Sequence, residues 1–233
     1  MNAMVLAAGR GTRLEALGLG VPKALVEIGG EPLLARQLRY LHGGGVQRIV
    51  VNAHHLGEAI EDFAAEYRSE GGGELAVIVE PQLLGTAGGV VNALELLGAD
   101  AFLVLYGDVL FDEPLAALMS THRKLDAAAT LTVYESEWLE GKGVVEADEH
   151  GMITGFVEKG ELAAGARGLV NAGLYVIEPP LLEGLQAGVE ADFGHDVFPA
   201  ALAAGERLAV HLLPAPVLDV GTPADLARAR AEA

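Results

Sequence analysis

Short apolar runs alternate with segments of helical periodicity in the first half of the chain. Four apolar runs are predicted strands: Met4–Ala8, Arg48–Asn52, Ala76–Val79 and Ala101–Tyr106. Three segments between them have the spacing of a helix face: Leu33–Leu41, Leu56–Tyr67 and Ala87–Leu97. This alternation predicts a Rossmann-like, doubly wound α/β fold with a mostly parallel mixed sheet. Ligands bind such sheets beyond the carboxyl ends of the strands.

The second half of the chain is richer in strand-like patterns. These are Thr130–Tyr134, Gly143–Ala147, Ile153–Lys159 and Leu169–Ile177, with a predicted hairpin turn at Asp148–Gly151. Helical patterns return at Pro180–Leu185, Asp196–Ala204 and Pro223–Glu232. No low-complexity linker separates the halves, so we expect one domain over residues 1–233, with a smaller β-rich lobe in its second half.

The first predicted strand runs into a loop that contains Gly9 and Gly11. Glycines there allow close approach of a ligand to the backbone, and successive amides can form an anion-binding nest. Arg10, Arg13 and Lys23 add positive charge. The loop is not a dinucleotide fingerprint, since Leu14 stands where a small residue is needed, and no Walker Gly-Lys-Ser/Thr follows. We expect it to hold a triphosphate, with a plain tight turn as the alternative.

The overall charge limits the possible partners. The chain carries 15 Lys and Arg against 33 Asp and Glu, a net charge of −18, which argues against nucleic acid as a partner. We expect most of the acidic excess to lie on the solvated surface. There is no cysteine, no signal-peptide pattern and no apolar run long enough to span a membrane, so we expect a cytoplasmic protein without a membrane partner.

Two carboxylates directly follow apolar runs. Asp108 comes after the predicted strand that ends at Tyr106, and Asp219 stands in a similar Val-Leu-Asp-Val-Gly context. Carboxylates placed in this way can hold Mg²⁺, whereas an Asx turn or a helix cap is the alternative for Asp108. The seven histidines show no metal-ligand spacing. Sequence by itself does not bring Asp108 and Asp219 together.

Taken in order, the motifs resemble the sugar-1-phosphate nucleotidyltransferase family. They are the glycine loop, the Pro-Lys-Ala-Leu of residues 22–25, the Glu-Pro-Gln-Leu-Leu-Gly-Thr-Ala-Gly-Gly of 80–89, Gly107-Asp108, Glu158-Lys159, Asn171-Ala172-Gly173 and the Asp219 segment. The resemblance is to short mannose- or heptose-1-phosphate guanylyltransferases. Because the sequence ends at Ala233, we expect no β-helix domain.

The resemblance implies a role for each motif. It assigns nucleotide binding to Leu6, Ala8, Gly9, Arg10, Gly11, Thr12, Glu80, Gly85, Thr86 and Ala87. It assigns catalysis to Arg13, Lys23 and Asp108, Mg²⁺ to Asp108 and Asp219, and sugar-phosphate binding to Gly143, Glu158, Lys159 and Asn171. Residues 1–110 then form mainly the nucleotide lobe, 111–220 mainly the sugar-phosphate lobe, and 221–233 a C-terminal helix. From the residues alone, Glu158-Lys159 also fits a solvated strand edge, and Asn171–Gly173 a turn.

The implied reaction transfers the nucleoside monophosphate of a triphosphate to a sugar 1-phosphate and releases pyrophosphate. Glu80 is acceptor-only when ionised, which suits the N1 and N2 hydrogens of guanine and favours GTP, whereas uracil or thymine also needs a donor. Gly85, Gly88 and Gly89 are expected to allow close backbone approach, and Thr86 to cap a helix. The alternatives are a uridylyltransferase on muramic-type or hexose 1-phosphates, a cytidylyltransferase on a phospho-alcohol or phosphonate, and a non-catalytic nucleotide-sugar-binding regulator. A homo-oligomer is also possible.

Three departures from the family pattern bear on these expectations. Ala16, Leu17 and Gly18 stand where relatives often have Pro-Leu-Thr, which loosens the loop. Lys142 replaces a frequent tyrosine, and its charge suits a second anionic group on the sugar. The Pro-Lys-Ala-Leu segment also occurs in phosphocholine-type cytidylyltransferases, although those typically lack the Gly-Thr-Ala-Gly-Gly run.

Overall fold

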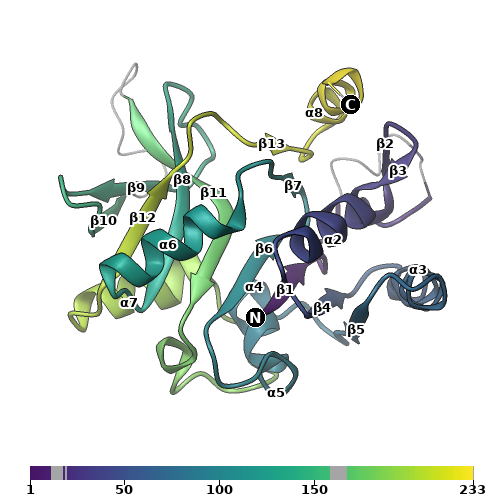
Figure 1. The fold of residues 1–233 in the computed structure, drawn as a ribbon, viewed down its shortest axis with the longest axis horizontal. Helices are drawn as coiled ribbons and strands as arrows, with labels where there is room; N and C mark the ends of the chain where they lie inside the picture. The colour runs from purple at the N-terminus through teal and green to yellow at the C-terminus, as the bar shows by residue number, and fades with distance from the viewer. Residues whose placement is uncertain (12–17, 19, 158–166, 233) are drawn as a thin grey trace.

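The computed structural model describes residues 1–11, 18, 20–157 and 167–232. Within them, a nine-stranded sheet runs through the molecule (Figure 1), with β12 pairing β8, β8 pairing β11, and the order β10-β9-β11-β6-β1-β4-β5. The strands are β1 (Asn2–Leu6), β4 (Arg48–Ala53), β5 (Glu74–Val79), β6 (Phe102–Tyr106), β8 (Ala129–Ser136), β9 (Val144–Ala147), β10 (Ile153–Val157), β11 (Gly168–Ile177) and β12 (Leu208–Leu212).

The sheet has a parallel half and a mixed half. β6, β1, β4 and β5 are all parallel, while β11 runs antiparallel to β6, β8 and β9. The predicted mostly parallel mixed α/β sheet is therefore confirmed. The β9–β10 hairpin turns at the expected Asp148–Gly151, where the Asp148 amide donates to the Met152 carbonyl oxygen (2.9 Å).

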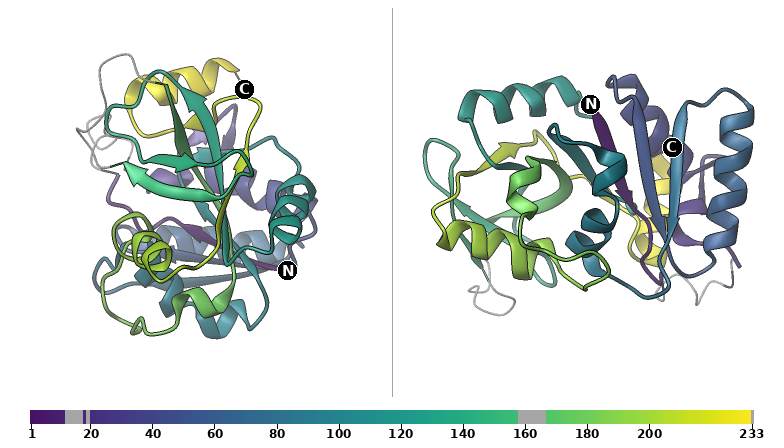
Figure 2. Two further views of the ribbon diagram at one scale, coloured as in Figure 1. Left: turned by 90° about the vertical axis from the view of Figure 1, so that its left-hand side faces the viewer. Right: turned by 90° about the horizontal axis from the view of Figure 1, so that it is seen from below.

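Helices cover both faces of the sheet (Figure 2). They are α2 (Leu33–Gly43), α3 (Gly57–Ser69), α4 (Gly85–Asn92), α5 (Leu94–Leu97), α6 (Leu115–Leu125), α7 (Phe198–Ala203) and α8 (Pro223–Glu232). One core lies under α2, α3 and α6 and the other under α4, α5 and α7. Because side chains of a strand alternate between the two faces of the sheet, successive residues of β1 pack in different cores: Val5 in the first and Met4 in the second.

Two short ribbons lie outside the main sheet. β2 (Glu27–Ile28) pairs β3 (Glu31–Pro32), and β7 (Val109–Leu110) pairs β13 (Leu218–Asp219). A third apolar cluster packs α8 onto the β2–β3 ribbon, with Val26, Ile28 and Leu226 among its buried residues. This contact brings the C-terminal helix back to the β2–β3 ribbon that leads into α2, as Figure 1 shows.

Several element predictions need correction. The helix expected over Ala87–Leu97 is broken at Ala93 into α4 and α5, and the helix expected over Pro180–Leu185 is a 3₁₀ turn over Pro179–Leu182. A π-helical turn, Phe193–Val197, precedes α7, where one helix over Asp196–Ala204 was expected. α6, β7, β12 and β13 were not predicted from the sequence.

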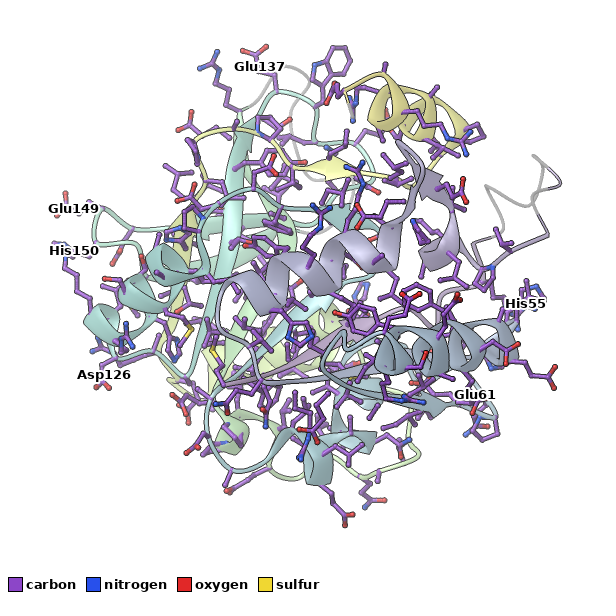
Figure 3. All side chains as sticks on the ribbon, turned by 45° about the vertical axis from the view of Figure 1, so that its right-hand side comes forward. His55, Glu61, Asp126, Glu137, Glu149 and His150 are labelled. Carbon is purple, nitrogen blue, oxygen red and sulfur yellow. The ribbon has the colours of Figure 1, made fainter. Side chains whose placement is uncertain are left out.

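The acidic surplus lies at the surface, as expected. Glu61, Asp126, Glu137 and Glu149 stand at the periphery of the molecule (Figure 3). Among the described Asp and Glu residues, only Glu80 is buried. No helix in the described part of the chain is long and apolar enough to cross a membrane.

Candidate active site

A cavity of about 430 Å³ opens beyond the carboxyl ends of β1, β4, β5 and β6. Each strand end contributes lining residues. They are Leu6 to Gly11 from the end of β1 onward, Asn52 near the end of β4, Glu80 just after β5, and Tyr106 to Asp108 from the end of β6 onward. The cavity is also lined by Lys23, Gly85, Thr86, Glu190, Asp192 and Gly221. The structure therefore gathers most of the predicted nucleotide-binding residues around one cavity.

The glycine loop forms one side of this cavity. Leu6, Ala8, Gly9, Arg10 and Gly11 all line it. Gly11 has φ +63°, and a Cβ added there would lie 3.3 Å from the Lys23 Cβ, so a side chain would be both strained and crowded. Thr12 and Arg13 lie outside the described residues.

Lys23 and Asp108 form an ion pair, with 2.7 Å between Lys23 Nζ and Asp108 Oδ2. Both side chains are partly shielded from water, 17% and 35% exposed, which strengthens their attraction relative to a surface pair. Lys23 lies in a single 3₁₀ turn, Lys23–Leu25, which begins after Pro22. The pair shows that both residues reach the same point of the cavity.

The β7–β13 ribbon brings Asp219 next to Asp108. Asp219 pairs with Val109, and the Val220 amide donates to the Asp108 carbonyl oxygen (2.8 Å). Partial burial raises the pKa of Asp219 most, and the negative charge of Asp108 raises it further. Because part of the Asp219 side chain is exposed, water screens some of both effects. Two mutually repelling carboxylates are a suitable binding place for a divalent cation, so the residues present fit Mg²⁺. Among the described residues no group of three or more His, Asp or Glu forms a ready-made metal site.

Glu80 is held by protein donors inside the cavity wall. Its Oε1 accepts from Asn52 Nδ2 (2.7 Å) and its Oε2 from the Leu84 amide (3.3 Å). Asn52 Oδ1 in turn accepts from the Ala7 amide (2.8 Å). Asn52 lies at the end of a buried strand and was missed from the sequence. An Asn among apolar residues at the carboxyl end of a parallel strand is the signal that identifies it.

The glycines of residues 85–89 serve contacts within the protein. A Cβ at Gly85 would overlap the Ala191 carbonyl oxygen, and one at Gly88 would lie 2.5 Å from the Val189 carbonyl oxygen. Ala87 is fully buried, donates its amide to Ala191 and is not among the residues that line the cavity. The space that Gly85 and Gly88 leave beside the backbone is therefore filled by residues 189–191 of the chain itself.

Thr86 does not cap α4, contrary to expectation. The helix starts from Leu84 without a side-chain cap, and the Thr86 hydroxyl donates to Asp192 Oδ2 (2.8 Å) and accepts from the Phe193 amide (2.9 Å). Asp192, which sequence reasoning gave no role, thereby enters the cavity lining. These two hydrogen bonds hold the start of α4 against a segment that lies more than a hundred positions later in the sequence.

The sugar-lobe residues lie on the other side of β6. The Asn171 amide donates to the Gly143 carbonyl oxygen (2.9 Å), and Asn171 Nδ2 donates to the Tyr175 hydroxyl (2.5 Å). Neither Asn171 nor Gly143 lines the 430 Å³ cavity. Glu158 and Lys159 lie outside the described residues. Lys142 donates to the Tyr134 hydroxyl (2.7 Å), and its charge acts to lower the pKa of Asp219, so Lys142 lies on the side of the paired carboxylates.

Tyr106 separates the two halves of the site. It lines the cavity, packs edge-on against the Tyr175 ring, and burial raises its pKa to about 12. The Tyr106 hydroxyl therefore stays neutral at physiological pH, and the side chain forms an uncharged part of the cavity wall.

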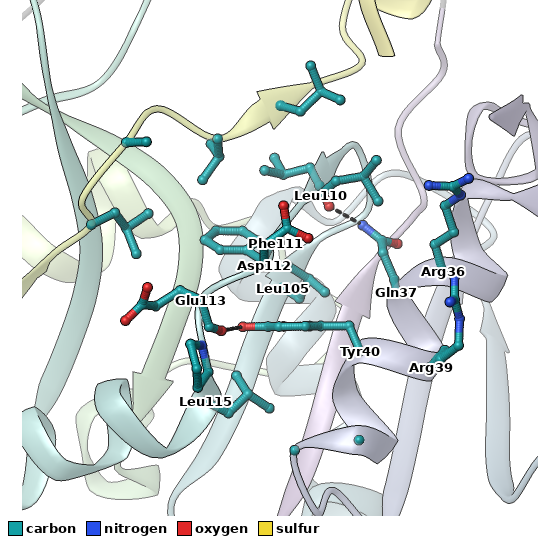
Figure 4. A pocket seen from close by; sticks show the side chains of 18 of the residues that line it. Arg36, Gln37, Arg39, Tyr40, Leu105, Leu110, Phe111, Asp112, Glu113 and Leu115 are labelled. Carbon is teal, nitrogen blue, oxygen red and sulfur yellow. Dashed lines mark hydrogen bonds between the residues drawn. The ribbon is translucent and has the colours of Figure 1, made fainter. Parts of the chain in front are cut away.

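A larger groove, about 950 Å³, lies elsewhere, between α2 and the segment that enters α6 (Figure 4). Tyr40 crosses it and donates to the Glu113 carbonyl oxygen (2.7 Å). Among the predicted site residues that the structure describes, none lines this groove. The smaller cavity, lined by the glycine loop, Lys23 and Asp108, is therefore the candidate active site, and Asp219 lies next to Asp108 although it is not among the lining residues.

The chain is similar to known proteins over almost all of its length. The model of the "Nucleotidyl transferase" family matches residues 2–233. A probable mannose-1-phosphate guanylyltransferase from Oryza sativa subsp. japonica is 33% identical over 97% of this chain and 62% of its own length. A UTP–glucose-1-phosphate uridylyltransferase from Synechocystis sp. is 32% identical over 88% of this chain and 56% of its own length. The chain thus spans less than two thirds of these two relatives.

A solved structure covers the chain more fully. The structure of HddC from Yersinia pseudotuberculosis, complexed with GMP-PN, has a TM-score of 0.83 and 26% identity. The match covers 99% of this chain and 98% of that protein.

Proposed function

Because the chain belongs to the nucleotidyl transferase family, we propose that it transfers a nucleoside monophosphate from a triphosphate to a sugar 1-phosphate. The observation that carries this proposal is the meeting of the glycine loop, Lys23 and Asp108 at one cavity, with Asp219 held beside Asp108 by the β7–β13 ribbon. The loop and Lys23 favour a polyphosphate, and the carboxylates favour the cation that accompanies it. An anion-binding loop beside two acids is hard to explain by packing alone.

The proposed step is an in-line displacement at the α-phosphorus. A phosphate oxygen of the sugar 1-phosphate attacks, the new P–O bond forms, and the bond to the β-phosphate oxygen breaks, releasing pyrophosphate. No proton transfer is required. The glycine-loop amides and Arg10 hold the triphosphate, and Lys23 leaves Asp108 to neutralise charge that develops on the α-phosphate. Mg²⁺, held by Asp108 and Asp219, would supply charge neutralisation and orientation of the phosphates.

The preferred nucleotide in this proposal is GTP. Glu80 presents a carboxylate in the cavity wall, which accepts hydrogen bonds and cannot donate when ionised. The guanylyltransferase name of the rice relative and the GMP-PN in the HddC structure support the same choice. The uridylyltransferase name of the Synechocystis relative keeps UTP as the second candidate. The acceptor is a hexose or heptose 1-phosphate, bound around Gly143, Asn171 and, by the resemblance, Glu158 and Lys159.

The test is pyrophosphate release from all four ribonucleoside triphosphates, each with mannose, heptose, glucose and muramic-type 1-phosphates, in the presence of Mg²⁺. We expect turnover with at least one pair and the highest kcat/KM with GTP. Turnover with CTP alone would favour the cytidylyltransferase alternative. Nucleotide-sugar binding without release of pyrophosphate from any pair would favour a regulator.

Lys23→Ala is expected to lower kcat about 100-fold or more, because the α-phosphate loses its positive partner in the transition state. Steady-state kinetics with the best substrate pair measure it. Lys124→Ala, on the exposed side of α6, is the matched control and is expected to match the unmodified protein. Near-normal turnover of Lys23→Ala would contradict the assignment.

A further inference from the structure

Asn52 connects three neighbouring strand ends at the candidate active site. It lies in β4, between β1 and β5, in register with Leu6 and Ile78. Its Oδ1 accepts from Ala7, just beyond β1, and its Nδ2 donates to Glu80, just beyond β5. The residue is 2% exposed. Both ends of its amide are therefore used by two segments that line the cavity.

Glu80 depends on this connection. It is the only buried acid in the described part of the chain, and a buried carboxylate is costly unless donors surround it. Asn52 Nδ2 and the Leu84 amide supply two donors. An ionised carboxylate accepts about four hydrogen bonds, so about two positions remain for a ligand. The orientation of those positions is set by where Asn52 holds Oε1.

α4 is built to accommodate the same pair. A Cβ at Gly89 would lie 2.6 Å from Asn52 Nδ2 and 2.8 Å from Glu80 Oε1, so only glycine fits there without moving the pair. The network is thus closed from the helix side as well as from the sheet. The preceding strand residues Val50 and Val51 pack in the two apolar cores, so the polar side chain of Asn52 serves Ala7 and Glu80.

We propose that Asn52 is a positioning residue for base recognition. It holds the Glu80 carboxylate at the angle that meets a purine edge carrying two N–H donors, and it fixes the Ala7 amide so that the glycine loop starts in one conformation. This inference rests on the proposed function, since it takes the cavity to bind a guanine nucleotide. It adds a residue that acts through Glu80 and touches no reacting atom.

Substitutions at Asn52 distinguish a role in orienting the Glu80 carboxylate from a role in packing alone. Asn52→Leu keeps a side chain that branches at Cγ, although a bulkier one, and loses both hydrogen bonds. Asn52→Asp keeps the acceptor for Ala7 but places a second carboxylate against Glu80, and two carboxylates this close share a proton readily. Once it is protonated, the introduced carboxyl group again donates to Glu80. Binding in this variant is therefore expected to recover as the pH falls from about 8 to about 6.

The measurement is GTP affinity by calorimetry together with steady-state kinetics for GTP and UTP at both pH values. For Asn52→Leu and Asn52→Asp at the higher pH, we expect Kd and KM for GTP to rise on the order of ten-fold, with kcat changed far less. The preference for GTP over UTP should fall by a similar factor. At the lower pH, Asn52→Asp should regain most of its affinity and Asn52→Leu should not.

Asn2→Asp is the matched control. Asn2 lies at the opposite end of the same sheet, where Nδ2 donates to the Leu97 carbonyl oxygen (2.8 Å), so the variant loses a comparable bond away from the cavity. The unmodified protein measured at both pH values is the control for every effect of pH that does not involve the introduced carboxyl group. Gly89→Ala provides an independent displacement of the pair and should mimic Asn52→Leu.

Unchanged GTP affinity in both Asn52 variants, or a loss in Asn52→Asp that persists at the lower pH, would overturn the inference while leaving the proposed activity intact. GTP binding that depends on Asn52 without any transfer to a sugar phosphate would support the inference and overturn the proposed activity.

Discussion

At the residue scale, Asp219 shows how a functional group can oppose stability. Its pKa is raised by partial burial and by the charge of Asp108, so the folded state binds a proton there more tightly than the unfolded state. Stability from this group is therefore greatest at low pH and decreases as the pH rises through the raised pKa. Above that range the ionised carboxylate opposes folding until a cation neutralises it.

Asp219→Asn is expected to raise the melting temperature at neutral pH without Mg²⁺ and to abolish Mg²⁺-dependent turnover. The gain should shrink as the pH is lowered, because Asp219 of the unmodified protein then becomes protonated. Scanning calorimetry over a pH series, with and without Mg²⁺, tests both points. Asp62→Asn, on the exposed face of α3, serves as the control. A lower melting temperature for Asp219→Asn at neutral pH would refute the proposed repulsion.

At the element scale, the site depends on how α4 meets the 189–193 segment. Gly85 has φ +71°, and the absence of a side chain there leaves room for the Ala191 carbonyl oxygen. The Thr86 hydroxyl forms hydrogen bonds with Asp192 and Phe193. The sequence predicts a glycine-rich loop leading into a helix here. It does not reveal the partner, because residues 189–193 are about a hundred positions away.

Gly85→Ala is expected to lower the free energy of unfolding by about 3 kcal/mol, combining left-handed backbone strain with overlap against Ala191. Gly71→Ala, at φ +84° with open space around it, has the strain alone and should lower it by about 1 kcal/mol. Urea unfolding measures both. Equal losses would show that the close approach of Ala191 is readily relieved.

At the scale of the whole molecule, the candidate nucleotide cavity and the residues proposed to bind the sugar phosphate stand on opposite sides of β6. β6 is parallel to β1 on one side and antiparallel to β11 on the other, so the change of direction occurs between the two halves of the site. Tyr106 and Tyr175 fill the junction as an edge-on aromatic pair with centroids 5.6 Å apart. The two substrates should therefore be separable by mutation.

Asn171→Ala is expected to raise KM for the sugar 1-phosphate about ten-fold or more and to leave KM for the triphosphate within about two-fold. Initial rates with each substrate varied in turn provide the measurement. The Asn52 variants should show the opposite pattern. A rise in both constants for Asn171→Ala would show that the junction transmits the change between the halves.

The sequence by itself determined the element types and the motif residues, because these depend on local periodicity and on residue chemistry. Four parallel-type strands, the glycine loop, Lys23, Glu80 and both metal-binding candidates were recognisable in this way. Short or amphipathic elements such as β7, β12, β13 and α6 were missed, since few residues carry their pattern and pairing with distant strands stabilises them.

Only the tertiary structure decided which of these residues meet. The contact of α8 with the β2–β3 ribbon and the pairing of β13 with β7 bring Asp219 beside Asp108, and β4 places Asn52 between Ala7 and Glu80. These contacts join positions far apart in the chain, and long-range pairing is set by the burial of whole elements. Residue chemistry is local, whereas the geometry that makes it useful belongs to the folded sheet.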